Sequence, residues 1–590
     1  MERRTFLKIL SSAGIVSLVS PTFAMEVCKN KVSKSSSALL ESAFRNPPFS
    51  SGVYTWWHWM NGNITKDGIT RDLEAMKANG IAGYQLFEAG SGIPIGPVES
   101  LSDEWVDLIL HTLKESERLG LEFAMHNCPG WSSSGGPWIT PDKAMQIITW
   151  SETKITGGKQ VRIQLPTPKH MFDYYIDTYC LAIPANMKVI PRLSILELSN
   201  RLDKDGVLTW DVPTGEWLIM RFGQTAKDQK NKSAPSKSTG LDCDKFSTEA
   251  LDYHLNCMFK RLMPAMEKIA KHSKIGLLID SYETGDQDWT SDMPAYFEQS
   301  HGYELYPFLP VLANKIVESE ESTKRFLFDF RRVRADMFAE RYYGHFQKRC
   351  KEKGIITYTE PYGGNMMEEL QVAQQLDINM GEFWCGQTVL WANYKYNRTV
   401  KQVASIAHTL GGKVVGAEAF TSEPDADKWL QYPYALKSLG DYMFTRGLSR
   451  IYFHRFAHQP HPTAAPGMTM GAWGLHFDRT NTWWKPGKAW IEYLNRCQYI
   501  FQSSTFYGDI LYHNGDDSFG STIEPEQTLL APPEGYDYDM VNTEMLDKAH
   551  IKDGKILFPA TRFDGYKLLV LLKSETMSLH TCLLYTSDAA

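Results

Sequence analysis

A repeated order of short apolar runs and longer helical segments constrains the fold of this chain more than any other feature of its sequence. Each run is rich in β-branched or aromatic residues, ends at polar residues and is followed by a segment with helical spacing. Eight such units predict an α/β fold in which parallel strands and crossover helices close into a (β/α)8 barrel of the TIM type. The predicted strands are residues 52–59, 81–88, 121–127, 275–283, 355–360, 377–384, 414–420 and 448–456.

One stretch interrupts the alternation after the third strand. There the pattern changes to short alternating strands separated by Gly and Pro, which predicts an inserted β-rich domain between barrel strands 3 and 4. We therefore expect barrel strands 1–3 within residues 45–144, the inserted domain at 145–240 and barrel strands 4–8 within 241–490. Residues 491–576 are expected to begin a C-terminal β-rich region.

The two ends of the sequence differ from the body of the chain. Residues 1–24 carry the adjacent Arg3 and Arg4 before an apolar run, which is typical of an export signal of the twin-arginine type cleaved after Ala24. This pattern predicts a bacterial protein exported to the periplasm or beyond. Residues 577–590 have no periodicity and are expected to be a non-native tail, so the natural chain is expected to continue into further β-rich domains.

Composition excludes several classes of protein. The 590 residues are 43% hydrophobic and 22% charged with a net charge of -7, which is typical of a globular chain and leaves no basic stripe for nucleic acid. No segment after the N-terminal apolar run is long and apolar enough to predict a membrane span. The nine cysteines include no CxxC pair, so neither a zinc ribbon nor a dense disulfide framework is predicted.

The predicted strands end almost uniformly in acids and imidazoles. In a barrel of this type the carboxyl ends of all strands meet at one mouth, where active sites lie. Acidic residues are disfavoured in strands and costly to bury, so several of them at one mouth indicate a use for their charge or protons. The residues at the strand ends are His58, Glu88, His126, Asn127, Asp280, Glu283, Glu360, Glu382, Glu418 and His454.

Paired carboxyl groups beside aromatic rings favour chemistry on sugars. Glycoside hydrolysis needs one carboxylic acid to protonate the leaving oxygen and one carboxylate to act as base or nucleophile. A ring beside a carboxyl group can stack on a sugar and raise the pKa of the acid by excluding water. We therefore expect a substrate-binding set around the catalytic carboxylates, made of His58, Asn127, Trp131, Asp280, Glu360, Trp384 and His454.

Several long strings resemble those of one known family, glycoside hydrolase family 106, the α-L-rhamnosidases. The resemblance runs from about residue 56 to residue 484. The strings are Trp56-Trp57-His58-Trp59-x-x-Gly62, Asp72-Leu73-Glu74-x-Met76-Lys77, His126-Asn127-x-Pro129-Gly130-Trp131-Ser132, Gly135-Gly136-Pro137-Trp138, Asp280-Ser281-Tyr282-Glu283, Gly381-Glu382-Phe383-Trp384 and Ala417-Glu418-Ala419-Phe420.

The resemblance implies an enzyme that removes terminal α-L-rhamnose with inversion, aided by a bound calcium ion. Carried over by motif, the family's catalytic glutamates fall on Glu283 and Glu418, with Glu382 as a third essential carboxylate and Glu283 as the expected acid. Calcium binds oxygen ligands from several kinds of group. The sequence contains no compact calcium-binding motif, so it does not identify the ligands.

Two other functions remain open at this stage. One is a retaining barrel glycosidase acting on another sugar such as a galactoside, whose two carboxyl groups would stand about 5–5.5 Å apart instead of about 6.5–9.5 Å. The other is a carbohydrate-binding protein without turnover. The sequence argues against it, because every matched glutamate is retained.

Overall fold

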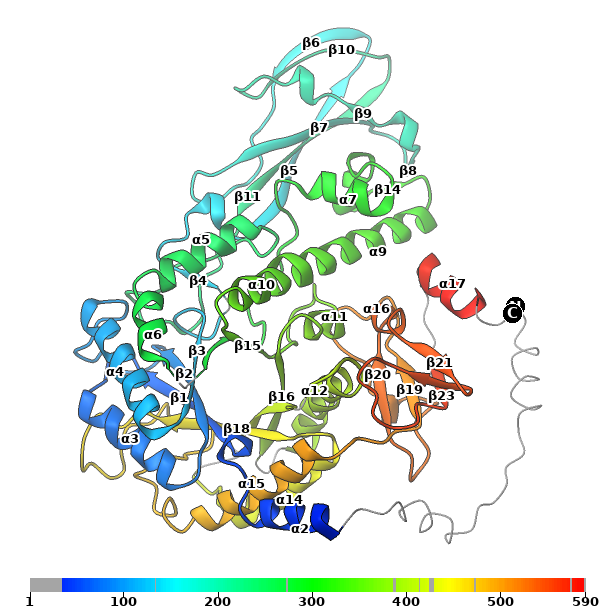
Figure 1. Cartoon of the computed structure of the whole chain (residues 1–590). Helices are drawn as coiled ribbons and strands as arrows, with labels where there is room; N and C mark the ends of the chain where they lie inside the picture. Colours follow the sequence, from blue (N-terminus) through cyan, green and yellow to red (C-terminus); the bar gives the residue numbers. More distant parts are fainter. Residues whose placement is uncertain are drawn as a thin grey trace. The chain divides into compact units, whose positions relative to one another are not determined.

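The computed structural model describes residues 34–132, 134–271, 274–385, 389–412, 414–423, 429–471, 474–572 and 576–587 (Figure 1). The chain divides into two compact units, Met1–Pro48 and Phe49–Ala590. Within the first unit the described helix is α2 (Lys34–Arg45). The predicted export signal, residues 1–24, lies outside the described residues. All elements considered below belong to the second unit.

Eight parallel strands form a closed barrel in the described part of this unit. Consecutive barrel strands are neighbours in the sheet, and the last strand pairs with the first. Each predicted run overlaps one barrel strand, so the barrel predicted from the alternation is confirmed. The strands are β1 (Tyr54–Met60), β2 (Gly83–Ala89), β3 (Glu122–His126), β13 (Ile275–Ile279), β15 (Ile356–Thr359), β16 (Ile378–Cys385), β17 (Gly416–Ser422) and β18 (Arg450–Ala457).

Helix-capping residues bound the helices between these strands, as α4 shows. The side chain of Ser102 accepts a hydrogen bond from the amide of Trp105 at the start of α4, and Gly120 ends that helix with φ 65°, a left-handed conformation that favours glycine. The main helices are α3 (Lys66–Ala78), α4 (Asp103–Leu119), α5 (Thr248–Phe259), α6 (Met263–Ile269), α7 (Met293–His301), α9 (Glu320–Met337), α10 (His345–Lys351), α11 (Glu369–Ala373), α12 (Val389–Leu410), α14 (Pro433–Thr445) and α15 (Lys488–Ser503).

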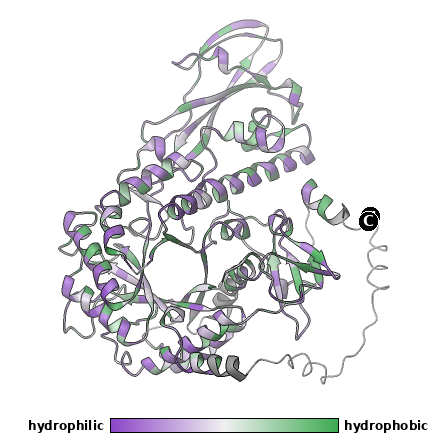
Figure 2. Ribbon diagram, viewed as in Figure 1, coloured by the Kyte–Doolittle hydropathy of each residue, from purple (hydrophilic) through white to green (hydrophobic). Residues whose placement is uncertain are grey.

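Helix α9 illustrates how these helices are held against the protein. It is mostly hydrophilic, as the purple ribbon in Figure 2 shows. Its apolar residues Phe326, Phe330, Val333 and Met337 recur every three or four positions and are buried. This spacing places them on one face of the helix, so burial of that face fixes the helix in place.

The interior of the barrel is filled by side chains below its mouth. Tyr54, Tyr358 and Tyr452 are buried inside the ring, and the rings of Tyr54 and Tyr452 lie 5.2 Å apart. The guanidinium of Arg450 lies 4.5 Å from the centre of the Tyr54 ring. Because these groups fill the interior, ligands can reach the barrel only from the carboxyl ends of the strands.

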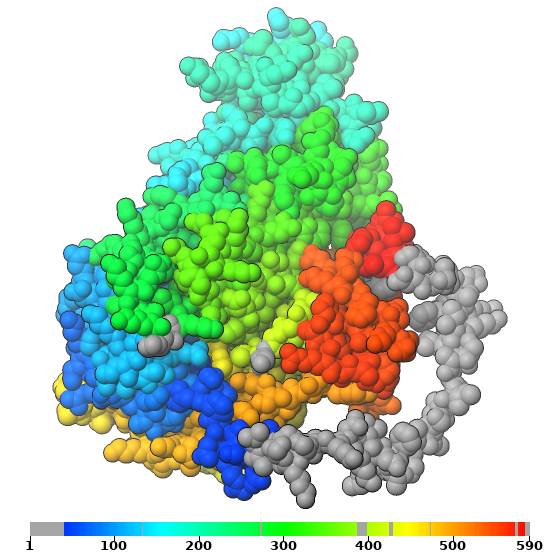
Figure 3. Space-filling model, viewed as in Figure 1, coloured from blue at the N-terminus to red at the C-terminus, as the bar shows by residue number. Residues whose placement is uncertain are grey.

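The residues between β3 and β13 include antiparallel sheets. A four-stranded sheet has the order β5-β11-β7-β9, and a separate pair is formed by β6 and β10. These strands bury a small core of their own, and in Figure 3 they gather in the cyan to blue-green projection. The strands are β5 (Gln146–Thr156), β6 (Lys159–Gln164), β7 (Ile176–Pro184), β9 (Leu196–Glu197), β10 (Val207–Val212) and β11 (Glu216–Ala226).

A small sheet follows the barrel. Its strands have the order β20-β19-β23, are parallel and pack on a separate buried cluster. These strands are β19 (Ile510–His513), β20 (Tyr538–Val541) and β23 (Leu568–Leu571), beside the hairpin β21 (His550–Lys552) and β22 (Lys555–Leu557). The predicted tail contains the helix α17 (Leu579–Ser587).

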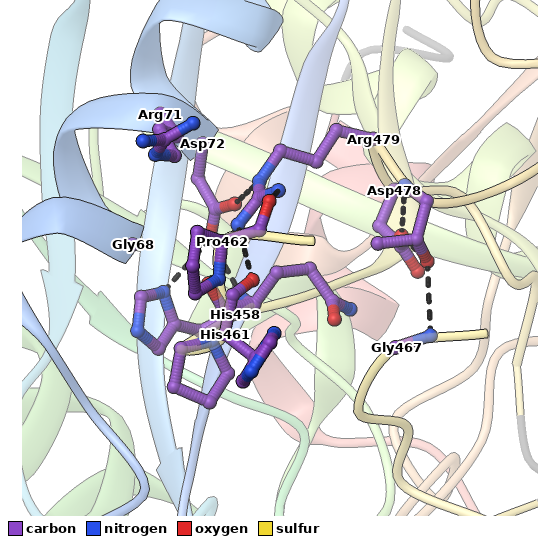
Figure 4. Close-up of polar contacts among 12 residues, drawn as sticks. Gly68, Arg71, Asp72, His458, His461, Pro462, Gly467, Asp478 and Arg479 are labelled. Atoms are coloured by element: carbon purple, nitrogen blue, oxygen red, sulfur yellow. Dashed lines mark hydrogen bonds and ion pairs between the residues drawn. The ribbon is translucent and has the colours of Figure 1, made fainter. Parts of the chain in front are cut away.

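A buried carboxylate joins the first and last units of the barrel (Figure 4). Asp72 of α3 is fully buried and binds four donors from other parts of the chain. Arg479 Nε donates to one oxygen at 2.7 Å, and His458 Nδ1 lies 2.8 Å from the other. The amide of Gln459 and the indole of Trp57 donate to that second oxygen at 3.0 and 3.2 Å. Asp72 therefore holds the loop after β18 against the first helix and the first strand.

The same contact explains a glycine in the first turn of α3. A Cβ atom on Gly68 would lie 2.6 Å from the carbonyl oxygen of Gln459 and 2.8 Å from the ring of His458. Only glycine therefore lets the helix approach the loop this closely.

Replacement of Asp72 by Ala is expected to lower the free energy of unfolding by about 3–5 kcal/mol, because it leaves the Arg479 guanidinium without its buried partner. Urea denaturation followed by tryptophan fluorescence measures this loss. Asp67→Ala, which breaks an exposed ion pair with Arg71 on the same helix, is the matched control and should change the value by less than about 0.5 kcal/mol. Equal losses of unfolding free energy in the two variants would contradict the role of Asp72 in holding the loop after β18 against α3.

Candidate active site

Two glutamates stand side by side at the mouth of the barrel. Glu382 on β16 and Glu418 on β17 are register partners on neighbouring parallel strands. Both are buried, with 8% and 6% of their surface exposed. The indole Nε1 of Trp384 donates to Glu382 Oε1 at 2.5 Å. Barrel closure thus brings two of the three predicted catalytic residues into one small volume.

The surroundings of Glu418 favour its protonated form. Burial raises its pKa well above the usual value, and the charges of Glu382, Asp280 and Glu283 raise it further. The Thr421 hydroxyl donates to Glu418 Oε1, and His454 Nδ1 lies 3.7 Å from the same oxygen. These surroundings therefore favour the protonated form of Glu418, which is the state that a general acid needs.

A second pair of carboxyl groups follows the neighbouring strands β13 and β15. Burial raises the pKa of Asp280 to about 8. Burial, together with the charge of Asp280, raises that of Glu360 well above its usual range. The Ser281 amide donates to Asp280 Oδ1 at 2.8 Å, and the Tyr362 hydroxyl donates to Glu360 Oε2 at 2.7 Å. These two predicted binding residues thus form an acidic pair that holds protons at neutral pH.

Glu283 differs from the other carboxyl groups of the mouth. Its side chain is 41% exposed, and one oxygen, Oε2, receives both the Lys232 ammonium at 2.6 Å and the Trp131 indole N–H at 3.1 Å. Hydrogen bonds from a cation and from an N–H group both stabilise the charged carboxylate. Glu283 therefore forms a half-exposed ion pair at the mouth.

Lys232 is a residue of the mouth that the sequence did not indicate. It lies in a polar loop rich in Lys and Ser, far from any barrel strand in sequence, and no motif marks it. The loop is held by main-chain contacts: the amide of Trp131 donates to the Lys232 carbonyl at 3.2 Å, and that of Gly90 to the Ser233 carbonyl at 2.6 Å. A Cβ atom on Gly130 would lie 2.1 Å from the Lys232 carbonyl oxygen, so glycine is required there.

Three buried histidines line the same mouth as neutral rings. Burial lowers the pKa of His126 and of His454 to about 3, and burial lowers that of His58 still more clearly. The rings of His58 and His454 meet edge to face, 5.6 Å apart. Within the described part of the chain, His58 Nδ1, His126 Nε2 and one oxygen each of Glu88 and Glu360 are buried without a hydrogen-bond partner. Such atoms fit the hydroxyl groups of a sugar.

Asn127 has a structural place in this arrangement. Its amide donates to the Leu278 carbonyl at 2.8 Å, and its oxygen accepts from the Ser134 hydroxyl at 2.7 Å. The residue is fully buried. Unlike the other predicted binding residues, Asn127 ties the loop after β3 to β13.

Among the residues that the structure describes, no group of three or more His, Cys, Asp or Glu side chains is arranged to hold a metal ion. Across the same residues, no helix has the length and apolar character needed to cross a membrane.

Two known proteins resemble this chain over most of its length. A protein of Formosa agariphila named "Putative beta-glucuronidase" is 39% identical over 574 residues, which cover 92% of this chain and 48% of that protein. The chain thus spans about half the length of this curated relative. The structure of a rhamnosidase from Novosphingobium sp. PP1Y matches with a TM-score of 0.83 and 24% identity, covering 93% of this chain and 68% of that one. This second likeness supports the fold.

A closed parallel barrel whose mouth gathers buried carboxyl groups defines a protein of the barrel glycosidase class. The model of glycoside hydrolase family 106, described as alpha-L-rhamnosidase, matches residues 45–178 and 169–584. The chain belongs to this family, which confirms the resemblance found in its sequence motifs.

The raised pKa of Asp280 predicts a pH dependence of stability. An unfolded aspartate titrates near pH 3.9, so the native state binds the extra proton between about pH 4 and pH 8. The stability that this proton contributes is complete below pH 4 and is lost as the pH rises to 8. Asp280→Asn removes the titration, so its unfolding free energy should fall less over this range, by about 1.4 kcal/mol for each unit of pKa shift. Unfolding free energies are measured by urea denaturation between pH 4 and pH 8. If they change equally with pH in the variant and the wild type, this assignment is contradicted.

Proposed function

We propose that this protein is an inverting glycoside hydrolase that releases terminal α-L-rhamnose from glycans, with Glu418 as general acid and Glu283 as general base. One observation carries the assignment of roles: Glu418 is buried among other carboxyl groups, which raise its pKa, whereas Glu283 is half-exposed and forms an ion pair with Lys232. Two carboxyl groups in such different surroundings are the usual signature of an acid and base pair.

This assignment reverses the one expected from the sequence, in which Glu283 was the acid. The motifs identify the two glutamates but carry no information about the groups around them. The Lys232 ammonium comes from a loop distant in sequence, and the charges that raise the pKa of Glu418 come from β16 and from the loop after β13. These contacts support the exchange of roles.

The reaction then needs one proton transfer at each end of the bond. Glu418 donates its proton to the glycosidic oxygen as the bond to the anomeric carbon breaks. Glu283 accepts a proton from the water that attacks that carbon from the opposite face, so the configuration inverts. Glu382, whose charge raises the pKa of Glu418 more than any other, keeps the acid protonated between turnovers.

A second candidate function comes from the curated relative. The Formosa agariphila protein is named for beta-glucuronides, and it shares 39% identity with this chain. A uronide would add a carboxylate to the ligand, and burial already disfavours charged groups in this mouth. The cost of burying a further charge disfavours that substrate, so rhamnose remains the proposal, and release of glucuronic acid from an aryl glucuronide would overturn it.

Calcium, export and the inserted domain are further proposals. The family resemblance supports a calcium ion, but the described residues contain no group of three or more His, Cys, Asp or Glu side chains arranged to hold a metal, so no step above uses it. Turnover before and after chelation tests this proposal. Residues 1–24 support export to the periplasm or the exterior, and the separate core of β5–β11 supports an inserted domain.

Glu418→Gln and Glu283→Gln are each expected to lower kcat on a rhamnosyl disaccharide by about 10²–10⁴-fold, because each removes one proton transfer and keeps the volume of the side chain. The roles separate when the leaving group changes. An aryl rhamnoside needs little protonation, so the Glu418 variant should recover most of its rate on that substrate and the Glu283 variant should not. Steady-state kinetics on both substrates measure the difference.

Thermal unfolding of the same two variants is the control. Neither change should lower the melting temperature of the protein, because each keeps the volume of the side chain. Recovery in the Glu283 variant instead would restore the roles expected from the sequence. Loss of stability with retained turnover would mean that the residue is structural.

The stereochemistry of the product is the second expected outcome. Proton NMR of a fresh hydrolysis of an α-L-rhamnoside should show β-L-rhamnose first, with the α anomer growing only by mutarotation. The α anomer appearing first would indicate a covalent intermediate and a retaining enzyme. Binding without any product would favour the carbohydrate-binding alternative.

A further inference from the structure

An exposed tryptophan lies in the segment between β17 and α14. Trp429 is 55% exposed, yet its ring is stacked on that of His476, with 3.8 Å between the ring centres and 13° between the planes. One face of the indole is thus covered by a histidine, and much of the ring is left to solvent. An exposed stacked pair of this kind adds little to a core.

The backbone at Trp429 is strained. Its φ is 62°, in the left-handed region that bulky residues rarely occupy. Strain of this kind persists where the surroundings over-determine the conformation, and it gathers at ligand sites. Here it presents a large ring to solvent.

Contacts of the segment before His476 place this pair at the barrel mouth. The amide of Gly474 donates to the carbonyl of Ser422, the last residue of β17, at 3.1 Å. The amide of Leu475 donates to the His454 carbonyl at 2.7 Å. A Cβ atom on Gly474 would lie 2.8 Å from Nδ1 of His454. The segment therefore runs over the ends of the two strands that carry Glu418 and His454.

His476 is itself well anchored. Its carbonyl accepts a hydrogen bond from the side-chain Nδ2 of Asn481 at 2.5 Å, and its Nδ1 lies 3.2 Å from the Thr469 hydroxyl. Burial lowers the pKa of His476 to about 4, so the ring behind Trp429 is uncharged at neutral pH. The pair is a fixed, flat and neutral surface.

We propose that Trp429, backed by His476, is the platform on which the enzyme binds the pyranose ring of the leaving group. This inference rests on the proposed function, because it needs the bond to be broken beside Glu418. The acid protonates the oxygen that stays with the leaving group, so that group extends toward the ends of β17 and β18. There the indole face can stack on the apolar face of a pyranose.

The test compares two substrates that differ in the leaving group, methyl α-L-rhamnoside and an α-L-rhamnosyl disaccharide. Trp429→Ala should lower the ratio of kcat/KM for the disaccharide to that for the methyl glycoside by about three- to tenfold, the size of an aromatic stacking contact. Trp429→Phe and His476→Phe should retain most of the ratio, whereas His476→Ala should lower it. Tyr442→Ala, at an exposed aromatic residue in the last turn of α14, is the matched control and should leave the ratio within about twofold.

Binding measured without turnover separates this proposal from the proposed function. In the Glu283→Gln background, calorimetry with the disaccharide should show weaker binding when Trp429 is also changed to Ala. If wild type cleaves neither substrate but this loss of binding is seen, the proposed function fails, and Trp429 binds a sugar that is not a leaving group. If both the ratio and the binding are the same with and without Trp429, the platform is overturned.

Discussion

Closure of the barrel is the constraint on which the rest of this structure depends. Eight parallel strands that meet in a ring bring every carboxyl end to one mouth. The buried Asp72 of α3 holds that helix against the loop after β18, the last barrel strand. The side chains at the mouth are therefore crowded and shielded from water. A carboxyl group in such a place retains its proton more strongly than one in solution, because burial destabilises the charged form.

This shielding differs from place to place, so two glutamates of the mouth have different surroundings. Glu418 lies deep between strands beside other acids, whereas Glu283 reaches the surface and meets an ammonium group. The same side chain thus has opposite surroundings in the two places. This difference follows from burial and from neighbouring charges.

Segments outside the ring complete the mouth. The loop that follows the β-rich segment delivers Lys232, and Gly130 is required for that loop to lie close. The segment after β18 delivers His476 beneath Trp429. The barrel thus supplies the carboxyl groups, and the connecting segments supply the groups that set their charge and that can meet the rest of the substrate.

The sequence by itself determined the order of the eight strands, the family and the carboxylates at the strand ends, because strand and helix periodicities and motif strings are local. Only the tertiary structure decided that Glu418 is buried beside other carboxyl groups, that Lys232 pairs with Glu283 and that Asn127 donates to the Leu278 carbonyl. Lys232 and Glu283 are 51 residues apart, and Asp72 and His458 are 386 apart. Contacts between such distant residues, and the burial that shifts a pKa, arise only when the chain closes on itself, so no local pattern could reveal them.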